Sequence, residues 1–204
     1  MMKQFVIFDT EYASWDGFLT DTPENKKKAE IVQIAALKVN ADNLSMAEEF
    51  NVYVKPHFRP KLTEYFIKLT GITDEKLAAE GIGYLEAYEQ FKSFVGDCIC
   101  FSHAWNEPAK SLSDGRVMQD NLELWGKKDT QHPDFRNLAP WFKREYARRG
   151  LNISQQCSGE VARLLGGADE LTSLNLDVHN ALYDVYSLLI GLRKLGFALN
   201  DETC

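Results

Sequence analysis

Short apolar runs separated by polar stretches predict the strands of a sheet. Residues 5–8, 31–39 and 50–54 are rich in β-branched and aromatic side chains, which is typical of strands. The turn-forming sequence at residues 41–43 lies between the second and third runs, so we expect an antiparallel hairpin there. Further along the chain, residues 98–102 predict another buried strand. An edge strand is expected near residues 130–135.

Apolar side chains at helical spacing predict the helices. Phe66 and Leu69 belong to the apolar face of a helix over residues 62–69, which Gly71 would end. Thr73 is a typical N-cap residue for the next helix. Further helices are expected over residues 84–95, 117–125, 137–149, 158–165 and 180–195. Strands followed by helices that alternate with strands indicate an α/β fold with a central mixed sheet. Because no linker or repeat interrupts the pattern, we expect residues 1–204 to form a single domain.

Composition and charge narrow the class of protein. The 204 residues are 45% hydrophobic and 12% aromatic, which fits a globular chain with a substantial core. There is neither a signal-peptide pattern nor an apolar stretch of membrane-spanning length, so we expect a cytoplasmic protein without a membrane partner. A formal net charge of −7 argues against a protein that coats nucleic acid through many phosphate contacts. This net charge is compatible with an enzyme that binds a few nucleotides through bound metal ions.

The cysteines do not predict a metal site. Cys98, Cys100, Cys157 and Cys204 are scattered, and no second Cys or His pair stands at zinc-binding spacing. We therefore expect them to be free or buried thiols in a reducing compartment.

Two acidic residues follow the first predicted strand. Asp9 and Glu11 are two positions apart, so their side chains would point to the same face, with Thr10 on the other. Carboxylates at the end of a core strand repel each other and resist desolvation. A divalent cation such as Mg²⁺ or Mn²⁺ relieves both costs, since these ions prefer oxygen ligands. A solvated strand end is the competing interpretation of this pair taken alone.

A second polar pattern opens the last predicted helix. His179 stands at its start, and Asp184 lies about one and a half turns further on, in the pattern His-x-Ala-x-x-Asp. A helix N-terminus lowers the pKa of a nearby histidine and favours anions. A neutral imidazole there could accept a proton from a water molecule.

Taken together, these two patterns resemble the DEDDh family of 3′→5′ exonucleases, over nearly the whole chain. The Leu-Thr-Gly-Ile sequence at residues 69–72 is similar to a family segment that helps to place the nucleic acid. Residues 30–35 are similar to its second-strand signature. The loop containing Trp15, and Ser-Gly-Glu at residues 158–160, are most similar to the Eri-like branch, whose members often trim RNA 3′ ends. The resemblance implies a ribonuclease H-like three-layer fold, with the central mixed sheet flanked by helices.

The family's middle aspartate has two candidates. Eri-like proteins commonly show Ser-Trp-Gly-x-Asp about seven residues before an asparagine. Asp114 stands in that register ahead of Asn121, although the preceding residues 111–113 lack the Trp-Gly pair. Asp120, inside the predicted helix, is the competitor. Residues 103–108 also look like a small insertion that could move the local geometry.

Carried onto this chain, the resemblance implies a catalytic site and a substrate. The implied ligands of two Mg²⁺ or Mn²⁺ ions are Asp9, Glu11, Asp114 and Asp184, with His179 as the general base. Two such ions can activate the attacking water and stabilise the leaving 3′ oxygen. The implied substrate is a single-stranded nucleic acid 3′ end, with RNA somewhat favoured over DNA, and the product is a nucleoside monophosphate.

Other side chains are candidates for contact with the substrate. Stacking and main-chain contacts would involve Thr10, Tyr12, Trp15, Phe66 and Leu69, each of which could instead be an ordinary packing residue. The predicted helix over residues 137–149 is basic, and its cations could bind the phosphate backbone, although a solvated helix face explains them equally well. Two alternatives to an RNA exonuclease remain: a binding module that keeps the fold without catalysis, and a DNA proofreading or repair exonuclease.

Overall fold

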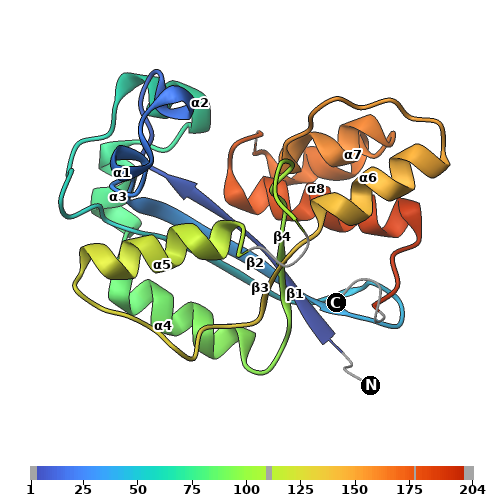
Figure 1. The fold of residues 1–204 in the computed structure, drawn as a ribbon, viewed down its shortest axis with the longest axis horizontal. Coiled ribbons are helices and arrows are strands. Elements are labelled where there is room, and N and C mark those ends of the chain that lie inside the picture. The colour runs from blue at the N-terminus through green and yellow to red at the C-terminus, as the bar shows by residue number, and fades with distance from the viewer. Residues whose placement is uncertain (1–3, 109–111, 177, 200–204) are drawn as a thin grey trace.

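The computed structural model describes residues 4–108, 112–176 and 178–199, so Ser111 and Cys204 lie outside the described residues. Within them, five strands form one mixed sheet in the order β3-β2-β1-β4-β5 (Figure 1). Their bounds are β1 (Gln4–Tyr12), β2 (Ile31–Asn40), β3 (Met46–Tyr53), β4 (Cys100–Ser102) and β5 (Phe135–Asn137). Strands β1, β2 and β3 pair antiparallel, whereas β1, β4 and β5 pair parallel. The predicted hairpin and mixed sheet are confirmed.

Helices cover both faces of the sheet (Figure 1). Because side chains alternate along a strand, Phe5 and Ile7 of β1 pack on one face, and Val6 and Phe8 pack on the other. The first face carries α6 (Ala139–Arg148), α7 (Val161–Leu164) and α8 (Ala181–Leu195), and the second carries α4 (Tyr84–Val95) and α5 (Asp114–Leu124). The predicted α/β fold of three layers is confirmed.

Short helices form a smaller cluster beyond the carboxyl end of β1. These are α1 (Pro23–Lys26), α2 (Glu64–Thr70) and α3 (Asp74–Glu80). Thr73 caps α3 by accepting a hydrogen bond from the Lys76 N–H at 3.2 Å, and α2 ends at Gly71 in a left-handed conformation. Three short 3₁₀ turns complete the description: η1 (Phe18–Thr20), η2 (Ser158–Glu160) and η3 (Ala168–Leu174).

Several predicted bounds were wrong, and each error has a physical reason. Strand β1 continues past residue 8 to Tyr12, because its polar end still pairs with β2 as far as Ile31. Asp9 and Glu11 therefore lie within the strand and not after it. Helix α5 starts at Asp114, before its apolar stripe begins, and β5 is fixed by three pairings to β4 at Phe135–Asn137 and not over residues 130–135. Turn η3 was not predicted, although its apolar residues Ala168, Leu171 and Leu174 recur every third position, which is the period of a 3₁₀ helix.

No helix in the described ranges combines the length and apolar character that crossing a bilayer demands.

Helix α8 lies close against its neighbours at a glycine. A Cβ added at Gly191 would overlap the Val161 side chain and would approach the Phe142 ring to 3.0 Å. The close packing of α8 against α6 and α7 thus depends on the missing side chain at this position.

We expect Gly191→Ala to destabilise the protein by about 1–3 kcal/mol, because overpacking forces neighbouring side chains out of place. Urea unfolding of the purified protein measures the difference. Gly83→Ala is the matched control, since a Cβ there meets nothing within 4 Å and Gly83 has a φ of −73°. Equal unfolding midpoints for the two variants would contradict this account of α8 packing.

Candidate metal centre and its surroundings

Three carboxylates meet between the sheet and α8. Asp9 and Glu11 point from β1 toward α8, the face that also carries Phe5 and Ile7. Asp184 points back from the first turn of α8. One carboxylate oxygen from each of Asp9, Glu11 and Asp184 lies within 4.8 Å of the others. Residues from opposite ends of the sequence thus form one acidic cluster.

Asp114 approaches the same cluster from the first turn of α5. Its N–H donates to the Ser102 hydroxyl at 3.3 Å, at the end of β4, and its carboxylate accepts a hydrogen bond from Thr10 at 3.4 Å. The negative charge of Asp114 raises the pKa of Asp9, Glu11 and Asp184. The structure therefore brings Asp114 to the acidic cluster.

Asp120 lies further along α5 among other charges. Burial raises its pKa, while Lys27 and Arg116 act in the opposite direction and Glu123 adds to the rise. The charges that act on the pKa of the clustered carboxylates include Asp114 and do not include Asp120. Of the two candidates for the middle aspartate, only Asp114 belongs to the cluster by position.

The crowded carboxylates resist ionisation. Burial is the largest cause of the raised pKa of Asp9 and Glu11, and the charges of Asp184 and Asp114 add to it. Desolvation raises the pKa of Asp184 to about 7 and that of Asp114 to about 6, although hydrogen bonds from Ser158 and Thr10 respectively lower them. Without a cation, burial and mutual repulsion therefore favour the protonated forms of these carboxyl groups.

A serine in η2 joins two of the carboxylates. The Ser158 hydroxyl lies 2.9 Å from Asp184 Oδ2 and 3.2 Å from Asp9 Oδ1. A hydroxyl has one proton, so it donates to one of these carboxylates at a time. The Ser187 hydroxyl on α8 lies 2.9 Å from the carbonyl oxygens of Ser158 and Gly159 and accepts a hydrogen bond from the Ala162 N–H at 2.9 Å. Ser187 thereby fixes η2 against α8.

Gly159 allows η2 to approach the Asp184 side chain closely. A Cβ at this position would overlap the Asp184 carboxylate and would come within 2.8 Å of Val178 Cγ1. A larger residue would therefore displace either η2 or Asp184.

The N-terminus of α8 is held by a pair of buried amides. Gln33 on β2 accepts a hydrogen bond from the Ala181 N–H at 3.1 Å and donates one to Asn180 at 3.1 Å. Asn180 is the N-cap and accepts a hydrogen bond from the Leu182 N–H at 3.2 Å. Because Asp184 lies one turn further along, this contact between β2 and α8 fixes its position relative to β1.

His179 precedes the helix cap instead of starting the helix. Its φ of 68° is left-handed, an uncommon conformation for a non-glycine residue, and its N–H donates to Asp184 Oδ1 at 3.3 Å. Burial lowers the pKa of the half-buried imidazole, and Glu160 acts in the opposite direction. The ring therefore favours the neutral form, which can accept a proton.

Sequence reasoning did not predict the roles of Ser158, Gln33 and Asn180. Ser158 and Gln33 both lie in segments that resemble family signatures, and this was their only signal. Nothing in their spacing shows that the first contacts two carboxylates or that the second holds the N-terminus of α8.

The structure separates the predicted substrate contacts into different environments. Thr10 uses its side chain to hold Asp114. Trp15 packs into its own loop, because its indole N–H donates to Asp21 at 2.9 Å, Phe18 meets it edge-on and Arg59 covers its ring. Tyr12 is partly buried and lies 5.5 Å from Phe18 between ring centroids.

The two remaining candidates lie on α2. Phe66 is 1% exposed and packs in a core cluster with Val32 and Ile72. Leu69 is 37% exposed and lines a pocket of about 430 Å³ that also includes Lys68 and Asn180. Of these two side chains, only Leu69 is open to a ligand.

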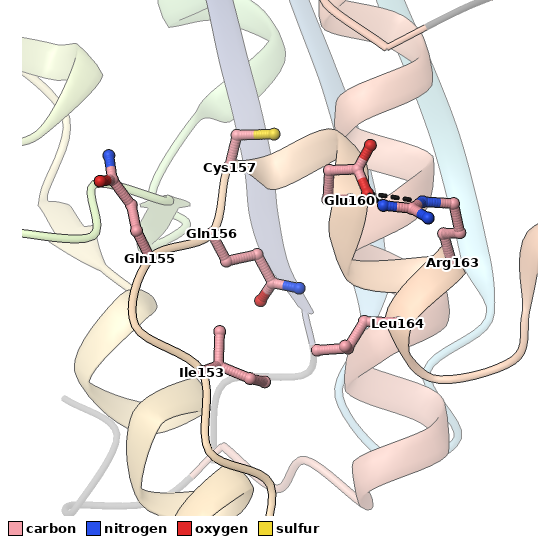
Figure 2. A pocket seen from close by; sticks show the side chains of 7 residues that line it. All are labelled: Ile153, Gln155, Gln156, Cys157, Glu160, Arg163 and Leu164. Carbon is pink, nitrogen blue, oxygen red and sulfur yellow. Dashed lines mark hydrogen bonds and ion pairs between the residues drawn. The ribbon is translucent and has the colours of Figure 1, made fainter.

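A second pocket of about 430 Å³ lies beside η2 (Figure 2). Gln156 and Cys157 line it from the segment before η2, and Leu164 lines it from α7. Glu160 and Arg163 form an ion pair at its rim, with Arg163 Nε donating to the Glu160 carboxylate at 2.6 Å. None of the four clustered carboxylates lines this pocket.

Most cationic side chains of the basic helix form hydrogen bonds or ion pairs within the protein. Lys143 donates to the Trp105 carbonyl and lies over the Trp105 ring. Arg148 and Arg149 both pair with Glu145, at 2.7 and 2.6 Å. These contacts favour a structural role for the basic helix.

The acidic cluster fits a divalent cation by its donor chemistry. Its ligand atoms are carboxylate oxygens, which hard cations prefer. None of the ion pairs recorded for the described ranges involves Asp9, Glu11, Asp114 or Asp184, so no Lys or Arg neutralises the cluster there.

We expect the metal-free protein to lose stability as the pH rises from about 4 to about 7. A carboxyl group whose pKa is raised on folding stabilises the folded state only while it is protonated, so the stabilisation is lost through the folded-state pKa. For Asp184, whose pKa is raised to about 7, the loss is at most roughly 4 kcal/mol. Thermal unfolding in chelator at pH 5 and pH 7.5, with and without Mg²⁺ or Mn²⁺, measures it.

Asp184→Asn is the matched control for this measurement, because the amide keeps the shape and cannot ionise. The variant should be more stable than the wild-type protein at pH 7.5 in chelator, and Mn²⁺ should stabilise it less. A wild-type melting temperature that metal ions leave unchanged at pH 7.5 would argue against a metal centre here.

Known proteins share the sequence pattern of this chain. A family model described as Exonuclease (RNase_T) matches residues 6–190. The chain is 31% identical over 101 residues to DNA polymerase III PolC-type of Halalkalibacterium halodurans, a match covering 50% of this chain and 6% of that protein. It is 27% identical over 93 residues to ERI1 exoribonuclease 2 of Xenopus laevis, covering 46% of this chain and 12% of that protein. The matched region is a small part of each curated relative.

Solved structures share the fold. Cell-death related nuclease 4 (CRN-4) superposes with a TM-score of 0.69 at 21% identity, covering 95% of this chain and 63% of that one. The nuclease domain of 3′hExo, a DEDDh family member bound to rAMP, gives 0.67 at 18% identity, covering 95% and 92%. E. coli Exonuclease I in complex with a dA16 oligonucleotide gives 0.67 at 15% identity, covering 95% and 41%. The chain therefore belongs to the exonuclease family whose model it matches, with the ribonuclease H-like fold of the DEDDh 3′→5′ exonucleases.

Proposed function

We propose that this protein is a metal-dependent 3′→5′ exonuclease that hydrolyses single-stranded nucleic acid ends to nucleoside monophosphates. The observation that carries the proposal is the meeting of Asp9, Glu11 and Asp184 within 4.8 Å, with Asp114 beside them. Without cations, such a cluster destabilises the folded state, because buried like charges repel each other. The chain that carries it also belongs to the exonuclease family. Residues 1–204 would act as a single exonuclease domain.

The four carboxylates would hold two Mg²⁺ or Mn²⁺ ions. When bound, such ions supply Lewis-acid chemistry that lowers the pKa of a water molecule and neutralises charge on the departing 3′ oxygen. Asp9 and Asp184, joined by Ser158, would provide ligands from the strand and from α8. Asp114 would provide a ligand from α5, with Thr10 holding its orientation.

His179 would be the general base. Its imidazole favours the neutral form, and it stands next to the cap of the helix that carries Asp184. The hydrogen bond from its own N–H to Asp184 ties the histidine to the acidic cluster. In this role it would take a proton from the attacking water, at a distance that substrate binding would set.

The terminal nucleotide would bind near the exposed side chain of Leu69. The pocket there is also lined by Tyr53, Lys68 and Asn180. Apolar, aromatic and cationic groups together suit a sugar, a base and a phosphate. Trp15 would support the neighbouring loop and would not stack on a base itself, because Arg59 lies over its ring and Phe18 meets it edge-on.

We favour RNA over DNA as the substrate. The match to an exoribonuclease and the similarity to a nuclease domain solved with rAMP support this choice. The match to a PolC-type DNA polymerase and the similarity to an exonuclease solved with dA16 support the alternative, a DNA proofreading or repair exonuclease. A cytoplasmic location is part of the proposal, and the free thiols of Cys98, Cys100 and Cys157 fit it.

The test is cleavage of 5′-labelled single-stranded RNA and DNA of one sequence, with Mg²⁺, with Mn²⁺ and with chelator. We expect metal-dependent shortening from the 3′ end, faster on RNA. Asp114→Asn should lower the rate by about 100-fold or more, because loss of a ligand costs several kcal/mol of transition-state stabilisation. Asp120→Asn, on the same helix, should stay within about threefold of the wild-type protein.

Each other outcome has a defined meaning. Release of the labelled 5′ mononucleotide as the first product would contradict the 3′→5′ direction. Loss of activity in Asp120→Asn with activity kept in Asp114→Asn would reverse the assignment of the middle ligand. Faster cleavage of DNA would favour the proofreading or repair alternative.

A further inference from the structure

An aromatic cluster lies on the surface at the far end of α5. Trp125 follows the last turn of that helix, and the His57 ring is tilted over it with 4.7 Å between ring centroids. Phe58 meets both rings, at 4.9 Å from His57 and 5.5 Å from Trp125. Phe58 is 49% exposed, although burial would suit a phenylalanine better.

A buried carboxylate fixes the backbone of this cluster. Glu30, which is 4% exposed, accepts hydrogen bonds from the His57 N–H at 2.6 Å and from the Arg59 N–H at 2.7 Å. Asn121 on α5 holds the neighbouring segment, since its amide donates to the Ala29 carbonyl at 3.0 Å and accepts from the Ile31 N–H at 2.9 Å. The exposed rings are therefore presented by a rigid framework.

Exposed cations lie beside this cluster. Lys27 and Lys28 are exposed, and the segment that carries them lies next to the rings because Glu30 accepts hydrogen bonds from the His57 and Arg59 N–H groups. Arg59 is exposed next to Phe58. Exposed cations beside an exposed ring, in a chain of net charge −7, indicate a surface for an anionic, aromatic ligand. We call His57, Phe58, Arg59, Trp125, Lys27 and Lys28 the aromatic–basic patch.

Helix α5 connects this patch to the acidic cluster. Asp114 opens the helix and Trp125 follows it, and Figure 1 shows α5 running toward α1 and α3. Its 11 residues span about 16 Å at a rise of 1.5 Å per residue. At a spacing of about 3.4 Å per stacked nucleotide, this length corresponds to about five nucleotides.

We propose that the aromatic–basic patch binds the substrate strand about five nucleotides upstream of the 3′ end that is hydrolysed. This inference rests on the proposed function and adds a second binding site to it. A base would stack on the exposed ring of Phe58, which the half-buried Trp125 supports. The neighbouring phosphates would contact Lys27, Lys28 and Arg59, whose guanidinium also lies over Trp15. A protein partner would need apolar area beyond these few rings, whereas a single strand needs only π-faces and cations at this spacing.

The experiment compares substrates of different length. We would measure kcat/KM for single-stranded RNA oligonucleotides of 2 to 10 nucleotides and for the p-nitrophenyl ester of thymidine 5′-monophosphate, which lacks an upstream strand. For the wild-type protein, kcat/KM should rise with length up to about six nucleotides and then stay level. Phe58→Ala with Lys27→Ala should lower it about 5- to 50-fold for the longer oligonucleotides. It should change less than twofold for the dinucleotide and the ester.

The matched control is Met46→Ala with Arg144→Ala. Met46 is 41% exposed on β3, and Arg144 is exposed on α6, so this pair removes one apolar side chain and one cation away from the patch. The control should keep the wild-type dependence on length. Equal losses on all substrates in Phe58→Ala/Lys27→Ala would overturn the proposal, as would no loss on any.

A binding assay separates failure of this proposal from failure of the proposed function. If the wild-type protein hydrolyses neither the ester nor any oligonucleotide, the exonuclease assignment fails. Fluorescence anisotropy of a labelled 10-nucleotide RNA with Asp114→Asn protein then tests the patch alone. Weaker binding by about 5-fold or more on adding Phe58→Ala and Lys27→Ala supports the patch. Unchanged binding overturns it, which is also the outcome expected if the patch serves a protein partner.

Discussion

Mutual repulsion of carboxylates is the constraint on which the rest of this structure depends. Asp9, Glu11 and Asp184 share one small volume, and Asp114 adds its field to theirs. Folding into this arrangement without metal costs free energy, because burial and like charges oppose ionisation. The surrounding contacts must therefore hold the acidic groups in place against this repulsion. Because folded proteins are only marginally stable, this cost is large relative to the free energy of unfolding of a 204-residue chain.

The contacts that meet this demand come from three elements. Gln33 fixes the start of α8 from the sheet, Ser158 joins the two carboxylates that arrive from opposite ends of the chain, and Ser187 holds η2 on α8. Ser158 and Ser187 are short side chains that lose little conformational freedom on folding, whereas the longer Gln33 side chain is held by hydrogen bonds to Asn51, Asn180 and Ala181. Gly159 and Gly191 contribute by having no side chain, since both allow close approach to α8. The packing around α8 thus fixes the positions of the clustered carboxylates.

The sequence predicted those parts of the site that local periodicity controls. Alternation along β1 placed Asp9 and Glu11 on one face, whereas the preference for Asp114 over Asp120 came from the family resemblance and not from periodicity. The contacts made by Ser158 and Gln33 could not be predicted, because they join segments about 150 residues apart and depend on how α8 packs. Strand β1 was predicted too short for a related reason: its pairing with β2 continues after its apolar run ends. Trp15 illustrates the same limit, since only the fold brings Arg59 over its ring.

The acidity of the chain poses a physical problem for an enzyme whose substrate is a polyanion. A net charge of −7 repels a polyanion at long range. Binding must therefore depend on local cationic groups that act within a Debye length of about 8–10 Å. Lysines 27 and 28 and Arg59 would meet this condition beside the exposed ring of Phe58, because a base would stack on that ring in a contact that salt weakens little. Cations at the acidic cluster would reverse its sign only when bound. An acidic body with a local cationic patch would therefore disfavour most nucleic acid contacts and accept a strand whose upstream part lies on that patch.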